Sequence, residues 1–195
     1  MRSILIAFTL ITFMSCGGGS STGGAAQLDG FETQTIANTG VTVATKKNTA
    51  GEIVERGYVS NGKRNGVWMT YYTADNVGRI RTLASYSDGM LNGPYLEFSN
   101  RGQIDKEINY EKNEYNGIYT EFKYGRKEKE ASYKNHKLDG TSKDFFQNGK
   151  VQKEINYKEG KQNGLMRYYN EEGEVTVEYQ YEMGNKISGG MVEKK

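Results

Sequence analysis

The chain has 195 residues, with 26 Lys and Arg against 24 Asp and Glu, and this near-neutral mixture excludes the basic surface that nucleic-acid binding requires. Leu, Ile, Val and Phe together supply only 36 residues, whereas Tyr alone supplies 15. This composition predicts a folded but thin protein, whose apolar surface comes from aromatic rings rather than a deep aliphatic core, and it disfavours an enzyme with a buried active site.

Residues 1–15 have the composition of an export signal. One Arg precedes an apolar run from Ile4 to Met14, which is too short to span a bilayer as a helix. The only cysteine of the chain, Cys16, follows directly. We therefore expect a signal peptide over residues 1–15.

The sequence FMSC (13–16) resembles the lipobox of bacterial lipoproteins, although Phe13 stands where that family prefers Leu. The resemblance implies cleavage before Cys16 and acylation of this residue, which would hold the protein on a lipid bilayer. Gly17 follows the cysteine where some inner-membrane lipoproteins carry Asp, so the resemblance favours the outer membrane of a bacterial cell envelope.

The next two segments lead into the main part of the chain. Residues 16–30 are rich in Gly and Ser and are expected to form a flexible tether with a reach of roughly 20 Å. Residues 31–50 are expected to be an N-terminal cap or linker, in which the alternating VTVAT (41–45) predicts a short strand.

Residues 51–190 contain an internal repeat, followed by a charged tail over 191–195. A Gly that follows Asn or Asp recurs at intervals of 27, 24, 23 and 24 residues, at Gly66, Gly93, Gly117, Gly140 and Gly164. We call these the repeat glycines. A glycine inside a strand would let a neighbouring ring lie across the backbone. We expect five to six copies of one small unit.

Aromatic residues flank each repeat glycine. Seven positions before the last four repeat glycines, and again near the end of the chain, stand the repeat tyrosines, Tyr86, Tyr110, Tyr133, Tyr157 and Tyr181, whereas Val59 fills the first slot. An aromatic stripe follows the glycines, at Trp68, Tyr71, Tyr95, Phe98, Tyr119, Phe122, Phe145 and Tyr169. Its members lie two and five positions after a glycine, which places them on opposite faces of a strand unless a bulge intervenes.

Each unit is predicted to be two short strands and two turns. In VQKEINY (151–157), Val151, Ile155 and Tyr157 alternate with polar residues, and pairs such as Asn61-Gly62 are a strong hairpin signal. One hairpin cannot bury enough surface to fold alone, so the copies must stack on one another. The prediction is an all-β fold, an elongated antiparallel single-layer sheet of stacked β-hairpin repeats.

The strings YSDGMLNGPYLEF (86–98), YKNHKLDGTSKDFFQNGK (133–150) and YKEGKQNGLMRYYNEEG (157–173) resemble the MORN-repeat variant family. The resemblance covers about residues 51–189. It implies a twisted single-layer β structure without a catalytic centre, and some bacterial relatives carry an antitoxin label, which implies binding of a partner protein. Ser142 departs from the family pattern because it replaces the aromatic after Gly140.

No set of residues predicts catalysis, a metal site or a cofactor site. The single histidine, His136, occupies a turn slot that Gly or Asn fills in sister copies, so its expected role is structural. The leading hypothesis is a non-catalytic lipoprotein that displays a β surface to a protein partner, in the manner of an antitoxin or immunity protein. The alternative is a glycan or peptidoglycan module that uses Tyr and Trp68, and a hydrolase would have to use His136 or an acid.

Overall fold

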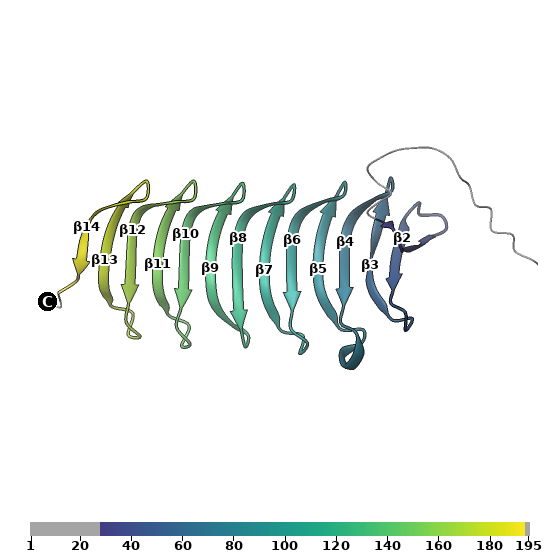
Figure 1. Ribbon diagram of the computed structural model, residues 1–195, viewed down its shortest axis with the longest axis horizontal. Helices are drawn as coiled ribbons and strands as arrows, with labels where there is room; N and C mark the ends of the chain where they lie inside the picture. Colours follow the sequence, from purple (N-terminus) through teal and green to yellow (C-terminus); the bar gives the residue numbers. More distant parts are fainter. Residues whose placement is uncertain (1–27, 194–195) are drawn as a thin grey trace, which may run out of the picture.

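The computed structural model describes residues 28–193 as one antiparallel sheet of 14 strands, in which each strand pairs only with its neighbours in sequence (Figure 1). The strands are β1 (Glu32–Thr35), β2 (Thr42–Lys47), β3 (Ile53–Ser60), β4 (Lys63–Tyr71), β5 (Ile80–Ser87), β6 (Met90–Phe98), β7 (Ile104–Glu111), β8 (Glu114–Lys123), β9 (Arg126–Lys134), β10 (Lys137–Phe145), β11 (Val151–Lys158), β12 (Lys161–Tyr169), β13 (Val175–Glu182) and β14 (Asn185–Met191). The prediction of an elongated, single-layer, all-β sheet of stacked hairpins is confirmed. One short 3-10 helix, Ala74–Asn76, lies between β4 and β5.

The tip edge of the sheet, uppermost in Figure 1, is formed by two-residue turns that close the hairpins from β3–β4 to β13–β14. Both residues of each turn have positive φ, as in Asn61 at 51° and Gly62 at 72°. This is the type I′ geometry, whose twist matches that of the flanking strands and which favours Asn and Gly. The Asn-Gly signals in the sequence therefore correspond to real turns.

Backbone hydrogen bonds join each tip to the tip before it. The N–H of the second turn residue donates to the carbonyl two positions before the preceding repeat glycine, over 2.7–2.9 Å in five successive repeats. The pairs are Gly89 to Arg64, Asn113 to Leu91, His136 to Tyr115, Gly160 to Leu138 and Gly184 to Gln162. These bonds fix the stacking of one hairpin on the next.

The opposite edge, which we call the loop edge, carries longer connections. Four of them have five residues, at 48–52, 99–103, 146–150 and 170–174, and their ends are closed by hydrogen bonds such as Ser99 N–H to Gln103 O at 2.8 Å. Next to this edge the register shifts by one residue in the pairings β4–β5, β6–β7, β8–β9, β10–β11 and β12–β13. The extra residue is a β-bulge, occupied by Arg81 in β5 and Asp105 in β7.

The repeat glycines lie directly across from the repeat tyrosines of the next unit, in the pairs Gly66–Tyr86, Gly93–Tyr110, Gly117–Tyr133, Gly140–Tyr157 and Gly164–Tyr181. Their φ values lie between 70° and 112°, which side chains rarely adopt. A Cβ on Gly117 would also lie 3.1 Å from the Cβ of Asn109. At four of the five glycines the crowding group is thus a Ser or Asn Cβ. A ring lies beside the fifth, Gly66, whose Cβ would be 3.6 Å from Tyr58 Cδ2, and a ring lies directly against Gly57.

The core is a single row of residues that runs across the middle of the sheet. Its members, in register, are Ala44, Gly57, Trp68, Ala84, Tyr95, Ile108, Tyr119, Ala131, Ser142, Ile155, Met166, Tyr179 and Gly189. Trp68 is 2% exposed and Ile108 is 3% exposed. Ser142 lies between Ala131 and Ile155 in this row. Both neighbours stay buried, so the small Ser142 side chain does not expose them to solvent. One row of side chains therefore supplies most of the buried apolar surface.

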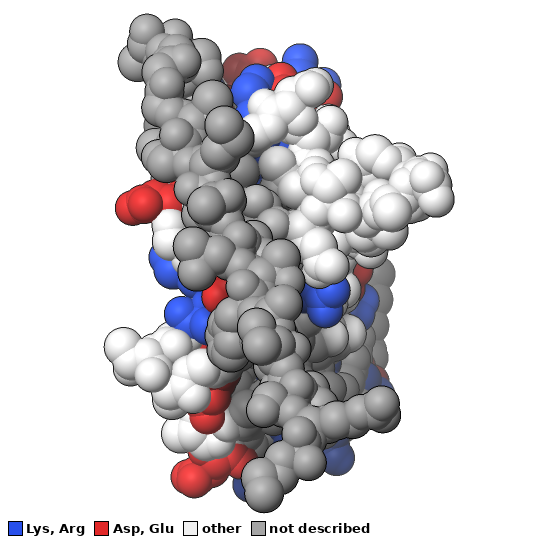
Figure 2. All heavy atoms as spheres, turned by 90° about the vertical axis from the view of Figure 1, so that its right-hand side faces the viewer, with Lys and Arg blue, Asp and Glu red and all other residues white. Residues whose placement is uncertain are grey.

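The ends of the sheet depart from the repeat. Residues 31–50 contain β1 and β2, so the region expected as a cap or linker pairs with β3. At the other end, the glycine of β14 is Gly189, eight positions after Tyr181 instead of the usual seven. It lies across from Tyr179. Viewed from the β1 end, acidic and basic side chains are interspersed on the described surface (Figure 2).

Candidate functional site

The repeat tyrosines and the core row lie on the same side of the sheet, because alternate residues of a strand point to one face. We call this side the tyrosine face. It carries all five repeat tyrosines and the first aromatic after the glycine in three repeats, Trp68, Tyr95 and Tyr119. The structure thus brings the repeat tyrosines together with three of the eight residues of the predicted aromatic stripe.

The second aromatic after each repeat glycine lies on the opposite face. Tyr71 is an odd number of positions from Trp68 with no bulge between them in β4, and its hydroxyl contacts the Met69 sulfur at 3.7 Å. Phe98, Phe122, Phe145 and Tyr169 occupy the same register position. The predicted aromatic stripe is therefore divided between two faces, because the bulge lies in the partner strand.

Rings on the tyrosine face pack edge to face along the sheet. Tyr115 is the centre of this cluster, with ring centroids 5.1 Å from Tyr110 and 5.3 Å from Tyr133. Tyr95 extends the contacts to β6, at 5.8 Å from Tyr110, and Tyr119 reaches Tyr133 at 6.0 Å. These contacts join four successive strands, so the rings have a structural role as well as forming a surface.

A second cluster surrounds Arg64 at the β3–β5 end of the same face. The guanidinium lies 4.3 Å from the Trp68 ring centroid and 5.4 Å from that of Tyr86, and it forms an ion pair with Glu55 at 2.7 Å. Phe31 packs on the edge of Trp68 at 5.6 Å. Arg64 is thus held by cation–π and ionic contacts, which makes it a structural part of this end.

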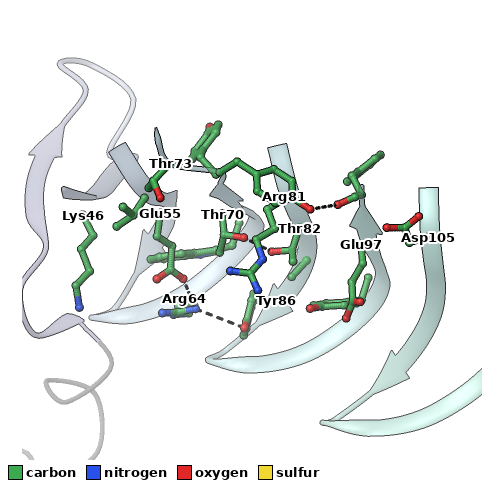
Figure 3. Close-up of a pocket in the computed structure, with 17 residues that line it drawn as sticks. Lys46, Glu55, Arg64, Thr70, Thr73, Arg81, Thr82, Tyr86, Glu97 and Asp105 are labelled. Atoms are coloured by element: carbon green, nitrogen blue, oxygen red, sulfur yellow. Dashed lines mark hydrogen bonds and ion pairs between the residues drawn. The ribbon is translucent and has the colours of Figure 1, made fainter. Parts of the chain in front are cut away.

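An open groove of about 860 Å³ lies on the tyrosine face across β3–β7 (Figure 3). Two bulge residues, Arg81 and Asp105, line it, together with Thr70 and Thr82, whose hydroxyls are 2.6 Å apart. The Arg81 guanidinium lies 6.0 Å from the Tyr72 ring centroid, and neither Arg81 nor Asp105 forms an ion pair within residues 28–193. The groove therefore presents two cations, Arg81 and Lys46, and one acid, Asp105, that have no ion-pair partner in residues 28–193.

A row of alternating charges continues from the groove toward the C-terminus, on the same face. It pairs Glu97 with Lys106 at 3.4 Å, Glu121 with Lys129 at 3.9 Å and Asp144 with Lys153 at 2.6 Å. The carboxylate of Asp144 raises the pKa of Lys153 above its ordinary value, chiefly through their hydrogen bond. These charges compensate each other across neighbouring strands, so the row has no net charge.

Burial raises the pKa of several tyrosines on this face. The pKa of Tyr95 rises to about 12, first because of burial and then because of the nearby Glu97 carboxylate. The pKa values of Tyr110, Tyr119 and Tyr133 are raised as well, again chiefly by burial. All four hydroxyls therefore stay neutral at physiological pH.

The most exposed aromatic side chains are not in the predicted set. In the part of the chain that the structure describes, only Tyr58 and Tyr124 are large aromatics with high exposure, at 47% and 79%. Trp68, which the glycan alternative named together with Tyr, is buried and cannot stack on a sugar. The sequence held a signal for Tyr124, because KYGR (123–126) stands where sister copies have a five-residue loop.

His136 lies at the tip edge, as the second residue of its turn. Its Nδ1 accepts a hydrogen bond from the Tyr115 N–H at 3.4 Å, and its ring stacks on Tyr115 at 4.7 Å. In the repeat before it, the Asn113 side chain accepts from the Leu91 N–H at 2.7 Å in the same way. Within residues 28–193 no group of His, Cys, Asp and Glu could hold a metal ion, and no helix there could cross a membrane.

Cys16 lies outside the described residues, as do the expected signal peptide and most of the expected tether. The last residue of the expected charged tail that the structure describes is Glu193.

A comparison with protein families matched one segment of the sheet. Residues 138–159 match the family model described as MORN repeat variant, over a segment that contains Gly140 and Tyr157. The protein is thus a β-hairpin repeat protein, one segment of which is similar to a MORN repeat variant. A comparison with curated proteins gave no match.

Two similar solved structures are a Staphylococcus aureus TarM mutant in complex with Fondaparinux, alpha-GlcNAc-glycerol and UDP, and a second TarM structure. The first is 18% identical with a TM-score of 0.36, over 54% of this chain and 21% of the other. The second is 19% identical with a TM-score of 0.36, over 55% of this chain and 21% of the other. This chain thus spans about a fifth of the length of either.

Proposed function

We propose that this protein is a non-catalytic binding protein, which holds a partner protein across the groove of its tyrosine face. The observation that carries the proposal is the pair of bulge side chains, Arg81 and Asp105, which line the groove without an ion-pair partner in residues 28–193. Charged groups of a partner would satisfy both, and an open groove of about 860 Å³ admits a peptide segment more readily than it shields a reaction from water.

The chemistry of the face supports binding rather than catalysis. Its tyrosines carry raised pKa values, so they serve as neutral donors and apolar contacts, which are common at protein interfaces. His136, the one histidine, lies at the tip edge, stacked on Tyr115, and takes part in the turn.

We further propose that the protein acts at the bacterial cell envelope. Acylation of Cys16 would anchor the protein, and we favour the outer membrane as its location. The flexible segment 16–30 would hold the sheet at a distance from the bilayer. In this setting the partner would be a toxic protein that is neutralised by binding, as expected for an antitoxin-like or immunity protein.

Site-directed photocrosslinking in cells tests the proposal. A photoreactive residue at Thr82, on the groove, should capture one defined protein, whereas the same residue at Arg101, in an exposed loop, should not. The variants Arg81→Glu and Asp105→Lys should each reduce the capture at least fivefold, and Arg101→Glu serves as the matched charge control. Equal capture from Thr82 and Arg101, or capture indifferent to both groove variants, would refute binding through the groove.

A further inference from the structure

The connection between β8 and β9 is the shortest on the loop edge. It consists of Tyr124 and Gly125 alone, whereas the other connections at this edge have five residues, or eight at 72–79. The shortening leaves a notch of about 410 Å³ beside the loop 146–150, within the range of roughly 300–1,000 Å³ that ligand sites occupy.

Tyr124 is the first residue of a two-residue turn, and it shares its backbone conformation with Lys112, Glu159 and Met183 in the tip turns. Its φ is 53°, in the left-handed region that Asn and Gly favour, and its side chain is 79% exposed. A bulky residue in this region costs roughly 1–2 kcal/mol. Neither packing nor turn geometry accounts for a tyrosine here, and a residue that departs from local preference marks a candidate for function.

The next strand departs from the repeat at the same place. Lys127 pairs with Phe122, in a register position where Ile80, Ile104, Val151 and Val175 stand in the other units. A cation thus replaces an apolar side chain beside the exposed ring. Lys127 therefore introduces a charge at a position that is aliphatic in the other units.

The notch combines an apolar floor with a cationic rim. Phe145 and Phe146 line it, and so do Lys123, Arg126 and Lys127, against one acid, Glu128. Lys123 forms an ion pair with Glu128 at 3.6 Å and Lys127 forms one with Glu130, so Arg126 is the lining cation without an ion-pair partner in residues 28–193. Arg126 donates one hydrogen bond to the Gln147 carbonyl at 3.0 Å, which positions the guanidinium and leaves its other N–H groups for a ligand.

We propose that this notch is a docking site for an acidic peptide segment, which places an apolar side chain against Tyr124 and the two phenylalanines. The inference rests on the proposed function and adds a second contact point for a protein partner. Tyr and Arg are among the residues that most often dominate interface energies, and the guanidinium of Arg126, which has no ion-pair partner in residues 28–193, favours carboxylates from the partner. The apolar floor favours a peptide over a sugar, whose hydroxyls would lose hydrogen bonds there.

Fluorescence anisotropy with the detergent-solubilised full chain tests this docking site. The probes are three labelled pentapeptides, Glu-Glu-Leu-Glu-Glu, Glu-Glu-Ser-Glu-Glu and Lys-Lys-Leu-Lys-Lys. We expect the first to bind at least fivefold more tightly than the other two, and its affinity to fall as salt rises. Binding by the lysine peptide that equals or exceeds binding by the first peptide, or no binding by the first peptide at millimolar concentration, would overturn the proposal.

Substitutions locate the binding. Tyr124→Asn keeps the favoured Asn-Gly turn, so the fold should persist while the affinity falls about tenfold. Arg126→Glu should reduce it at least as much, and Tyr58→Asn, at the other exposed aromatic, should leave it unchanged. Equal affinities for the wild type and Tyr124→Asn would refute the site. If Tyr124→Asn binds the peptide as tightly as the wild type but Thr82 still captures a protein, the notch is refuted and the proposed function stands. If the peptide binds as expected but Thr82 captures nothing, the groove is refuted and the notch stands.

Discussion

The indole of Trp68 lies against the backbone of Gly57. A Cβ at position 57 would come within 2.2 Å of Trp68 Cδ2, closer than any side chain can approach, and the Trp68 Nε1 donates to the Tyr58 carbonyl at 2.8 Å. The two residues are register partners in β3 and β4. The largest side chain of the core row therefore depends on the smallest residue beside it.

Gly57→Ala tests this dependence. The methyl group would displace the ring, so we expect the free energy of unfolding in urea to fall by about 3 kcal/mol. In a Trp68→Leu background the same change should cost much less, because the overlapping ring is gone. Additive losses in the double variant would contradict the direct contact.

Gly117→Ala should destabilise the protein by about 1–3 kcal/mol, because φ is 112° and the new Cβ would crowd the Cβ of Asn109 at 3.1 Å. Gly190→Ala is the matched control, since a Cβ at that glycine would meet no atom within 4 Å and its φ is not positive. Chemical denaturation of both variants measures the difference. A loss at Gly190 as large as that at Gly117 would show that glycine content alone matters.

Substitutions of His136 separate its structural role from a catalytic one. His136→Ala removes the acceptor for the Tyr115 N–H and places Ala at a φ of 64°, so we expect a loss of about 1–2 kcal/mol. His136→Asn should lose about half as much, because Asn113 makes the equivalent bond one repeat earlier. Thermal unfolding gives the order, and an Asn variant weaker than the Ala variant would contradict the turn assignment.

Ionisation of tyrosines on the tyrosine face should destabilise the fold at high pH. The folded pKa of Tyr95 is about 12, above the unfolded value of about 10, so its stabilising contribution is present below pH 10 and is lost as the pH rises through 12. NMR titration of the Tyr95 ring measures this pKa. Glu97→Gln should lower it while keeping it above the ordinary value, since burial is the larger cause, and an unchanged pKa would exclude the carboxylate as a contributor.

The recurring Tyr and Gly were sufficient to predict the hairpin stack, because Asn61-Gly62 and its counterparts form type I′ turns from local sequence alone. The bulges were not predictable. Arg81 and Asp105 line the groove only because one extra residue shifts the register beside the loop edge, and that shift depends on pairing between strands. The sequence also did not predict which aromatic side chains are exposed. Trp68 and Tyr124 are both aromatic, yet Trp68 is buried and Tyr124 is exposed to solvent.

Each strand pairs only with the strands beside it in sequence, from β1 to β14. Order can therefore spread along the molecule from any hairpin, without the long loop closures that slow other β proteins. Whole hairpins could be gained or lost during evolution without disturbing distant contacts. Such a molecule can lengthen to fit its target by duplication alone.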